Sequence, residues 1–464
     1  MENKALDKAL KLLGITPNSN ARNIIAECNS WYTNSETAFH ERVNLNGVKV
    51  VIESMNFAKR GCADDANLCE VVDIDTGSST ERVNEILNAN NFSVMFRQQL
   101  EEASATGTVG AYWYLKDAYY TGDVLTKGTP AINYVLSGEQ VIPITVENNE
   151  VIECAFCGES LRDGKKVGTV VAFRLNENGM YRCDTVSVTD KNVEEMVSIE
   201  LGDVKPFALL RTAQVNNLKN MEGYGLPKLK EAIPVLKALD LAYNILFGDL
   251  DKGDKLVFIN ELLSCIGTDL TTGQPMLTKQ QKKLFVLLGD KLPEEDHLIH
   301  EYNPTIRIEE ITKVFETLLS LFSMMFGYGT KKYTFENGQI KTASEYIGER
   351  QDCMQEVNKQ RGSATEYIKD LIDGMVWFMG RFGGEKLAVN EINVDYDDSY
   401  IEDKNAKLER VRADAQTFDI PELTIWYLME AYNLDEKAAK DLVIRNQERK
   451  DGEELEDSNL NEND

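Results

Sequence analysis

The 464-residue sequence predicts an α+β fold with a long helical hairpin and a helical C-terminal part. Residues 107–210 are rich in β-branched and aromatic residues that alternate with polar ones, as half-buried strands do. Two later segments, about 227–250 and 306–326, carry apolar residues three or four positions apart, which is the period of a helix packed on one face. Strands gathered in one part of the chain and helices in others are typical of the α+β class.

The first 210 residues are expected to form one α+β domain. Apolar anchors in residues 1–45 predict two helices, separated by Gly14 and Pro17. Residues 46–75 alternate in the manner of strands, and residues 80–104 predict another helix. The β-rich segment follows, with turn-forming asparagines between its strands.

A helical hairpin is expected next. Its first helix would hold some 24 residues, and at 1.5 Å per residue it would extend roughly 36 Å. Pro234 is expected to kink its first turns. Residues 251–305 predict a compact insert with strands at 256–259 and 297–302 and a short helix at 278–288, before the second helix runs back. The apolar positions expected to pack the hairpin are Leu236, Leu239, Tyr243, Leu246, Val314, Leu318 and Phe322.

The stretch from Phe326 to Glu345 joins the second helix of the hairpin to another helix. It contains glycines and the basic pair Lys331-Lys332. Thr342-Ala-Ser-Glu345 has the form of a capping box, in which the threonine hydroxyl and the carboxylate cap the first turn reciprocally. A loop between two long helices is typical of a mechanical part rather than of a catalytic site.

The remaining chain is predicted to be mainly helical. A long helix over residues 342–382 ends at Gly383-Gly384, and a strand over 388–396 leads to helices at about 402–416 and 421–446. From Glu448 onward the chain is strongly acidic and nearly free of apolar residues, so the tail is expected to be disordered.

Composition limits the classes of function. Hydrophobic residues make up 42% and charged residues 27%, as in soluble globular proteins, and no apolar run reaches the length that spans a bilayer. The N-terminus lacks a signal-peptide pattern, which favours synthesis in a cytosol with eight free thiols. A net charge of −27 predicts repulsion of nucleic acid over most of the surface, so that any DNA contact would use a few local lysines.

No motif for catalysis, a metal or a cofactor survives inspection, although two patterns leave alternatives. Cys154-Ala-Phe-Cys157 has the spacing of half a zinc site, but no second pair follows, and a strand with two buried thiols is favoured. An acidic cluster could bind a hard cation, but the interpretation as a turn and helix cap is favoured; its members are Asp395, Asp397, Asp398 and Asp403. Lys331, Lys332 and Lys341 could either touch phosphates as point charges or be solvated loop residues.

Several stretches between residues 220 and 410 resemble, in order, the portal proteins of tailed bacteriophages, especially the Gram-positive phage portal group. The stretch Lys341–Tyr346 is the most specific. The others are Tyr224-Gly-Leu-Pro227 with Val235–Tyr243, Tyr302-Asn-Pro-Thr-Ile-Arg307, Phe326-Gly-Tyr-Gly329, and Asp395-Tyr-Asp-Asp-Ser399 with Asp403-Lys404.

The resemblance implies a portal-like fold with an α+β wing, a two-helix stem, a small α/β clip and a helical crown. The implied boundaries are 1–226 and 342–385 for the wing, 227–251 and 306–327 for the stem, 252–305 for the clip, 328–341 for a tunnel loop, 386–447 for the crown and 448–464 for the acidic tail.

The resemblance also implies a function. The protein would form a ring, typically of twelve subunits, at one capsid vertex of a virion assembled in the host cytoplasm. Double-stranded DNA would pass through it without sequence recognition, past Lys331, Lys332 and Lys341. The clip would bind the large terminase subunit and then a head-completion adaptor, while capsid and scaffolding proteins would surround the ring. The expected clip contacts are Leu256, Phe258, Leu284 and Phe285.

Two other classes of function stay open at this point. The chain could be a structural component of another injection or secretion assembly without DNA passage. An enzyme ranks third and last among the interpretations, because no catalytic motif supports one.

Overall fold

The computed structural model divides into two compact units, Met1–Asp395 and Tyr396–Asp464. The residues that it describes are 4–43, 47, 49–121, 124–162, 164–189, 192–253, 256–260, 285–288, 299–302, 307–330, 332–333, 343–397, 404–418, 420–432 and 434–446.

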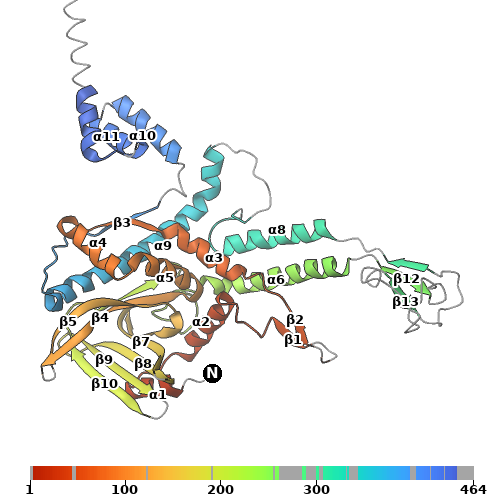
Figure 1. Ribbon diagram of the computed structural model, residues 1–464, viewed down its shortest axis with the longest axis horizontal. Helices are drawn as coiled ribbons and strands as arrows, with labels where there is room; N and C mark the ends of the chain where they lie inside the picture. The colour runs from red at the N-terminus through yellow and green to blue at the C-terminus, as the bar shows by residue number, and fades with distance from the viewer. Residues whose placement is uncertain are drawn as a thin grey trace, which may run out of the picture. The chain divides into compact units, whose positions relative to one another are not determined.

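Two antiparallel sheets form the centre of the first unit (Figure 1). The larger has five strands in the order β10-β9-β8-β7-β6, and the smaller has three in the order β11-β4-β5. The strands are β4 (Thr108–Thr121), β5 (Val124–Val135), β6 (Val141–Glu147), β7 (Glu150–Arg162), β8 (Lys165–Leu175), β9 (Tyr181–Thr189), β10 (Val193–Glu200) and β11 (Phe207–Arg211).

Each face of the five-stranded sheet has its own core. Helix α1 (Lys4–Leu12) covers one face, where Leu10 packs with Cys157 and Val170. On the other face Cys154 and Phe156 meet Phe207 of the smaller sheet. Residues three apart on a strand point to opposite faces, so the two cysteines of β7 lie in different cores. Strand β7 therefore carries two buried thiols, and the half zinc site is excluded.

Helices α5 and α9 lie against the smaller sheet. The indole Nε1 of Trp113 on β4 donates to the Leu371 carbonyl of α9 at 2.9 Å, and the buried Tyr367 hydroxyl donates to Gln99 of α5. The body of the unit thus has layers of helix, sheet, sheet and helix. Its helices are α1, α2 (Ser19–Tyr32), α3 (Phe57–Ala66), α4 (Thr80–Ala89), α5 (Phe92–Thr106) and α9 (Ala343–Phe378), with short helical turns η1 (Asn67–Cys69), η2 (Gly77–Ser79), η3 (Gly138–Gln140) and η5 (Met379–Gly383).

Two short ribbons complete the body. Strands β1 (Glu41–Val43) and β2 (Lys49–Val51) pair with each other, and β3 (Val71–Asp75) pairs with β15 (Asn393–Tyr396).

Helices α6 (Lys228–Lys252) and α8 (Ile308–Met325) form the helical hairpin (Figure 1). Arg307, just before α8, makes a bidentate ion pair with Asp249 near the end of α6, at 2.8 and 2.9 Å, which fixes the two helices antiparallel. Helix α6 continues through Pro234. The insert contains β12 (Leu256–Asn260), which pairs parallel with β13 (Phe285–Leu288) and antiparallel with β14 (Ile299–Tyr302).

The second unit contains α10 (Lys404–Phe418), α11 (Pro421–Tyr432) and a further helical segment over residues 436–446. The sequence predicts one helix over 421–446. The structure has two helices instead. The side chain of Asp435 accepts from the Ala438 N–H at 2.9 Å and so caps the start of the second one.

Several local predictions are wrong. Residues 46–75 are not all strand-like, since α3 occupies residues 57–66; its buried positions are small or polar, which hides the helical period. Residues 285–288 form a strand where a helix is expected, and residues 278–284 lie outside the described residues. The helix expected at 80–104 is two helices, because Asn91 adopts a φ of +57° between them. The strand expected at 388–396 begins only at Asn393.

Other predictions are confirmed. Helices α1 and α2 are separated at Gly14 and Pro17, and β-structure fills residues 108–211. Both hairpin helices lie within two residues of the expected ends. Thr342 of the capping box and the tail 448–464 lie outside the described residues.

Candidate functional site: the helical hairpin and its base

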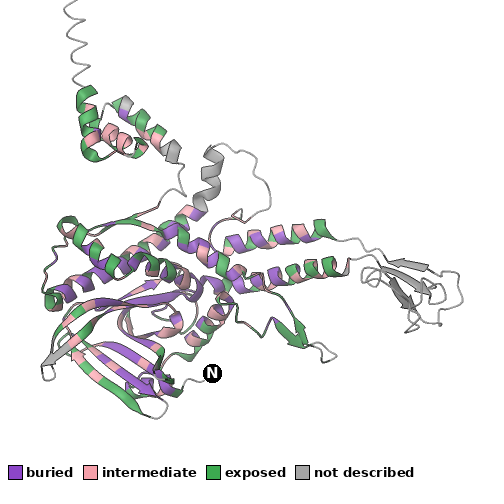
Figure 2. Cartoon of the chain, viewed as in Figure 1, coloured by how far each residue is buried: buried purple, intermediate pink, exposed green. Residues whose placement is uncertain are grey.

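The hairpin exposes many large apolar side chains. Exposed residues become frequent toward the C-terminal end of α6 and the N-terminal end of α8 (Figure 2). Phe247 is 57% and Leu250 53% exposed on α6. Large exposed apolar side chains gathered on one surface usually mark an interaction site, so the hairpin lacks part of its cover in a single chain. The exposed set is Leu241, Tyr243, Ile245, Phe247, Leu250, Ile308, Val314, Leu321 and Met324.

The residues predicted to pack the hairpin fall into three groups. Leu236, Leu239 and Phe322 are buried, and Leu246 and Leu318 are half-buried. Tyr243 and Val314 are 36% and 48% exposed. Leu236, Leu239 and Phe322 therefore pack within the chain, whereas Tyr243 and Val314 are available to another molecule.

A buried charge cluster lies where the hairpin meets the body. Lys228, the first residue of α6, places its Nζ 2.9 Å from Asp65 Oδ1 of α3 and 3.4 Å from Glu356 Oε1 of α9. Ser104 of α5 donates its hydroxyl to the other Asp65 oxygen, and Gln214 donates to Glu356 at 2.9 Å. Side chains from four helices, α3, α5, α6 and α9, therefore meet in this cluster.

The ammonium of Lys228 stays charged. Its burial alone would lower the pKa of Lys228, but the carboxylates of Asp65 and Glu356 raise the pKa above its ordinary value. A buried ammonium is tolerated only when carboxylates and hydrogen bonds replace water. The cluster thus depends on all its members.

The residues after α8 join this cluster. The Tyr328 hydroxyl donates to Asp65 Oδ1 at 2.9 Å, and the Tyr333 hydroxyl donates to Asp64 Oδ2 at 2.8 Å. Burial raises the pKa of both tyrosines, so both hydroxyls remain protonated donors. Gly327 makes the turn between α8 and Tyr328 with a φ of +81°, and a Cβ there would lie 2.8 Å from Glu356 Cγ.

Lys332 lies between the two tyrosines in sequence and is half-buried. Its N–H donates to Ser323 Oγ at 3.3 Å, and its Nζ lies 3.9 Å from the ring centroid of Tyr328. Lys331 and Lys341 lie outside the described residues.

The predicted contact residues of the insert are placed only by their backbone. Leu256 and Phe258 belong to β12, and Phe285 belongs to β13, whereas Leu284 lies outside the described residues.

A second set of polar contacts holds α6 to His40 and Met55, which lie in the N-terminal part of the chain. His40 Nε2 lies 2.9 Å from Asp240 Oδ2, and Asp240 Oδ1 accepts from the Met55 N–H at 2.8 Å. Burial alone would lower the pKa of His40, but its bonds to Asp240 and Glu36 raise that pKa, which favours the imidazolium.

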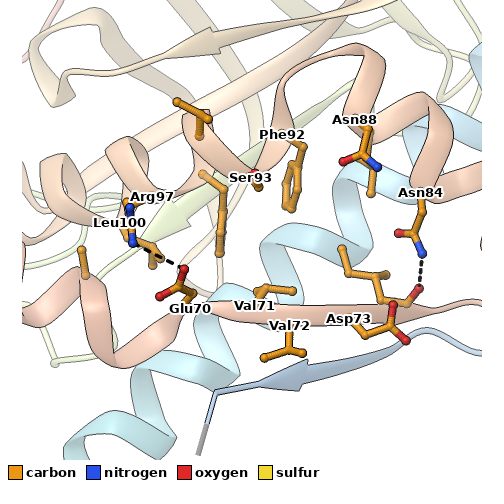
Figure 3. A pocket seen from close by; sticks show the side chains of 15 residues that line it. Glu70, Val71, Val72, Asp73, Asn84, Asn88, Phe92, Ser93, Arg97 and Leu100 are labelled. Carbon is orange, nitrogen blue, oxygen red and sulfur yellow. Dashed lines mark hydrogen bonds and ion pairs between the residues drawn. The ribbon is translucent and has the colours of Figure 1, made fainter. Parts of the chain in front are cut away.

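A cavity of about 410 Å³ lies between β3 and helices α4 and α5 (Figure 3). Apolar side chains such as Val71 and Phe92 line it. Arg97 at one end pairs with Glu70 at 3.4 Å, and Asn84 at the other end donates to the Ile74 carbonyl. Arg97, Glu70 and Asn84 are thus engaged with each other or with the backbone rather than directed at one point in the cavity.

Within the described ranges, no group of three histidine, cysteine, aspartate or glutamate side chains is arranged to hold a metal ion. Of the helices in that part of the chain, none combines the length and hydropathy needed to cross a membrane.

The charge cluster has no recognisable pattern in the sequence as a whole. Asp65 and Lys228 lie 163 positions apart, and each reads alone as a surface residue. The one available signal is the adjacent pair Asp64-Asp65 in a segment of small residues, which suggests burial beside charge.

Three comparisons relate the chain to known proteins. The family described as "Phage portal protein, SPP1 Gp6-like" matches residues 12–450. Comparison with curated proteins returned no match. Among solved structures, the neck of a native GTA particle, computed with C12 symmetry, is similar with 10% identity and a TM-score of 0.36, over 77% of this chain and 85% of that one. The virion of the native gene transfer agent particle is similar with 11% identity and a TM-score of 0.35, over 86% and 94%.

Proposed function

Because this chain belongs to the SPP1 Gp6-like family of phage portal proteins, we propose that it forms a ring at one capsid vertex that conducts double-stranded DNA during packaging and ejection. The resemblance found in residues 220–410 is confirmed, and the family match extends it to residues 12–450. The protein is a portal protein, and its family is structural rather than enzymatic. It is a component of a phage virion.

The exposed apolar side of the hairpin carries the proposal of a ring. Phe247, Leu250 and Val314 would be covered if α6 and α8 of one copy packed against the next copy. A head-to-tail interface of this kind closes into a ring when its rotation closes. Twelve copies are proposed from the family resemblance.

The parts of the chain take the names that the resemblance implies. We assign residues 227–251 and 306–327 to the stem, residues 252–305 to the clip and residues 328–341 to the tunnel loop. Residues 1–226 and 342–385 form the proposed wing, and residues 386–447 the crown.

The charge of the protein supports passage of DNA rather than its retention. A chain with net charge −27 repels phosphates over most of its surface, which suits a channel that must release every base pair. Lys331, Lys332 and Lys341 are the proposed sparse contacts, without sequence recognition.

We further propose that the clip binds the large terminase subunit during packaging and a head-completion adaptor afterwards. Leu256, Phe258, Leu284 and Phe285 are the proposed contact residues. Major capsid and scaffolding proteins would contact the ring from outside as the particle assembles in the host cytoplasm.

Electron microscopy of the purified full chain tests the ring. Closed rings with a channel as wide as a DNA duplex are expected, and native mass spectrometry gives their subunit number. Monomers or open filaments would refute the proposal and favour a component of another assembly without DNA passage.

Paired lysine variants test the contacts with DNA. Lys331→Ala combined with Lys332→Ala is expected to leave ring assembly intact but to alter packaging or retention of DNA. Unchanged packaging in this double variant would count against the assignment of the loop.

A further inference from the structure

The first residues after α8 are fixed to the body by two tyrosine hydroxyls that reach neighbouring carboxylates of one helix. We propose that Tyr328 and Tyr333 are positioning residues, and that Asp64 and Asp65 of α3 are the mount that fixes the root of the loop after α8. The root is residues 326–330 and 332–333. Only its position beside a channel rests on the proposed function, since the mount itself is a property of the single chain.

Aromatic packing holds both tyrosines in reach of the mount. The Tyr333 ring lies 5.2 Å from Phe57 and 5.8 Å from Phe322, centroid to centroid, and Phe57 contacts Phe322 at 5.0 Å. Gly61 of α3 permits this approach, because a Cβ there would lie 2.6 Å from the Phe322 ring. The end of α8 and helix α3 are therefore in direct contact, which leaves little room for the root to shift.

The charge of the mount strengthens each bond. Asp64 also pairs with Arg60 at 2.9 Å, and Asp65 also pairs with Lys228 at 2.9 Å, so each tyrosine bonds to a carboxylate that takes part in an ion pair. Hydrogen bonds to ionised acceptors are about twice as strong as neutral ones. Since Lys228 begins α6, the start of one hairpin helix and the root that follows the other are held at the same carboxylate.

The contacts of Tyr328 and of the end of α8 also position Lys332. Its Nζ lies over the ring of Tyr328, whose hydroxyl is bonded to Asp65, and its N–H is bonded to Ser323 of α8. The two tyrosines thus determine where the backbone and ammonium of Lys332 lie. A ring of such chains would present this lysine at one defined height in every subunit.

Phenylalanine substitutions test the mount without removing the ring packing. Tyr328→Phe, Tyr333→Phe and the double variant are compared with wild type in the full chain and in the same assembly state. Hydrogen–deuterium exchange is measured for peptides covering residues 326–333, and tryptic cleavage is measured at the Lys332–Tyr333 bond. Each lost hydroxyl is expected to raise local exchange and cleavage about tenfold.

Tyr224→Phe is the matched control. Its buried hydroxyl donates to the Val141 carbonyl at 2.9 Å, away from α3, so its loss lowers stability without freeing the root. Unchanged exchange in the double variant would overturn the proposal, as would an equal increase in the control. Asp64→Asn, which retains an acceptor oxygen, is expected to preserve more protection than Asp64→Ala, and equal loss in both would also overturn it. Rings that form normally but carry no DNA would refute the proposed function while leaving the mount intact.

Discussion

Removing the buried ammonium of Lys228 is expected to destabilise the first unit strongly. In Lys228→Met the side chain keeps a similar length, but Asp65 and Glu356 remain buried beside each other without their counter-charge. Loss of one partner from a buried ion pair costs about 3–5 kcal/mol. The exposed fraction of the Lys228 side chain is 0%, so solvent cannot replace its charge between the two buried carboxylates.

Thermal unfolding measures this loss. Unfolding entropy is about 2 cal/mol/K per residue, so a unit of 395 residues should lose roughly 4–6 °C in Tm for that cost. The melting of purified full-length variants is followed by circular dichroism at pH 7.5. A double variant that adds Asp65→Asn removes one uncompensated carboxylate and is expected to recover about half of the lost stability.

Lys230→Met provides the matched control. Lys230 also pairs with a carboxylate, Glu27 at 2.6 Å, but both side chains are partly exposed. Such a pair contributes about 1 kcal/mol or less. If Lys228→Met changed the free energy of unfolding no more than Lys230→Met does, the inference that the cluster depends on its ammonium would be wrong.

Two further predictions concern a carboxyl group and a close backbone contact. Burial, followed by the charge of Glu101, raises the pKa of Glu102 to about 7, and its Oε2 is buried without a hydrogen-bond partner among the described residues. Its ionisation therefore reduces stability as pH rises from about 4.5 to 7. Glu102→Gln should raise the free energy of unfolding by up to about 3 kcal/mol at pH 8 and by little at pH 5; an equal gain at both pH values in denaturant titrations would contradict this. Gly225→Ala should cost about 1–3 kcal/mol in the same titrations, because a Cβ would lie 2.2 Å from the Gly107 carbonyl oxygen. Gly158→Ala, whose Cβ would meet nothing within 4 Å, should cost nothing, and similar losses in both variants would show that sterics at Gly225 are not the cause.

The predictability of the fold depended on the size of the buried side chains. Helices α6 and α8 bury leucine, isoleucine and phenylalanine at helical spacing, so their periods are visible in the sequence. Helix α3 instead buries Ala58, Gly61, Cys62 and its two aspartates. Hydropathy has no helical signal there, although that face packs closely enough that a Cβ at Gly61 would lie 2.6 Å from the Phe322 ring.

The exposed apolar face of the hairpin was predictable only in part. A periodic pattern identifies an apolar face but not the molecule that covers it. Leu239 and Tyr243 lie one turn apart on α6 and both fit the pattern, yet the first is buried by its own chain and the second is exposed. The bonds of the mount on α3 were not predictable beyond the adjacent pair Asp64-Asp65, because they join residues more than 160 positions apart through polar groups that carry no period.

If copies associate as proposed, the uncovered end of the hairpin ties part of this protein's folding to its concentration. Side chains such as Phe247 and Leu250 gain little from folding in an isolated chain, since water still reaches them. The sheets and their helices, by contrast, bury their cores within one chain. Dilution below the concentration at which copies associate should therefore loosen the far turns of α6 and α8 first, while the sheets stay folded. Each added subunit would then stabilise its neighbour, because it would cover apolar side chains of α6 and α8 that are exposed in the isolated chain.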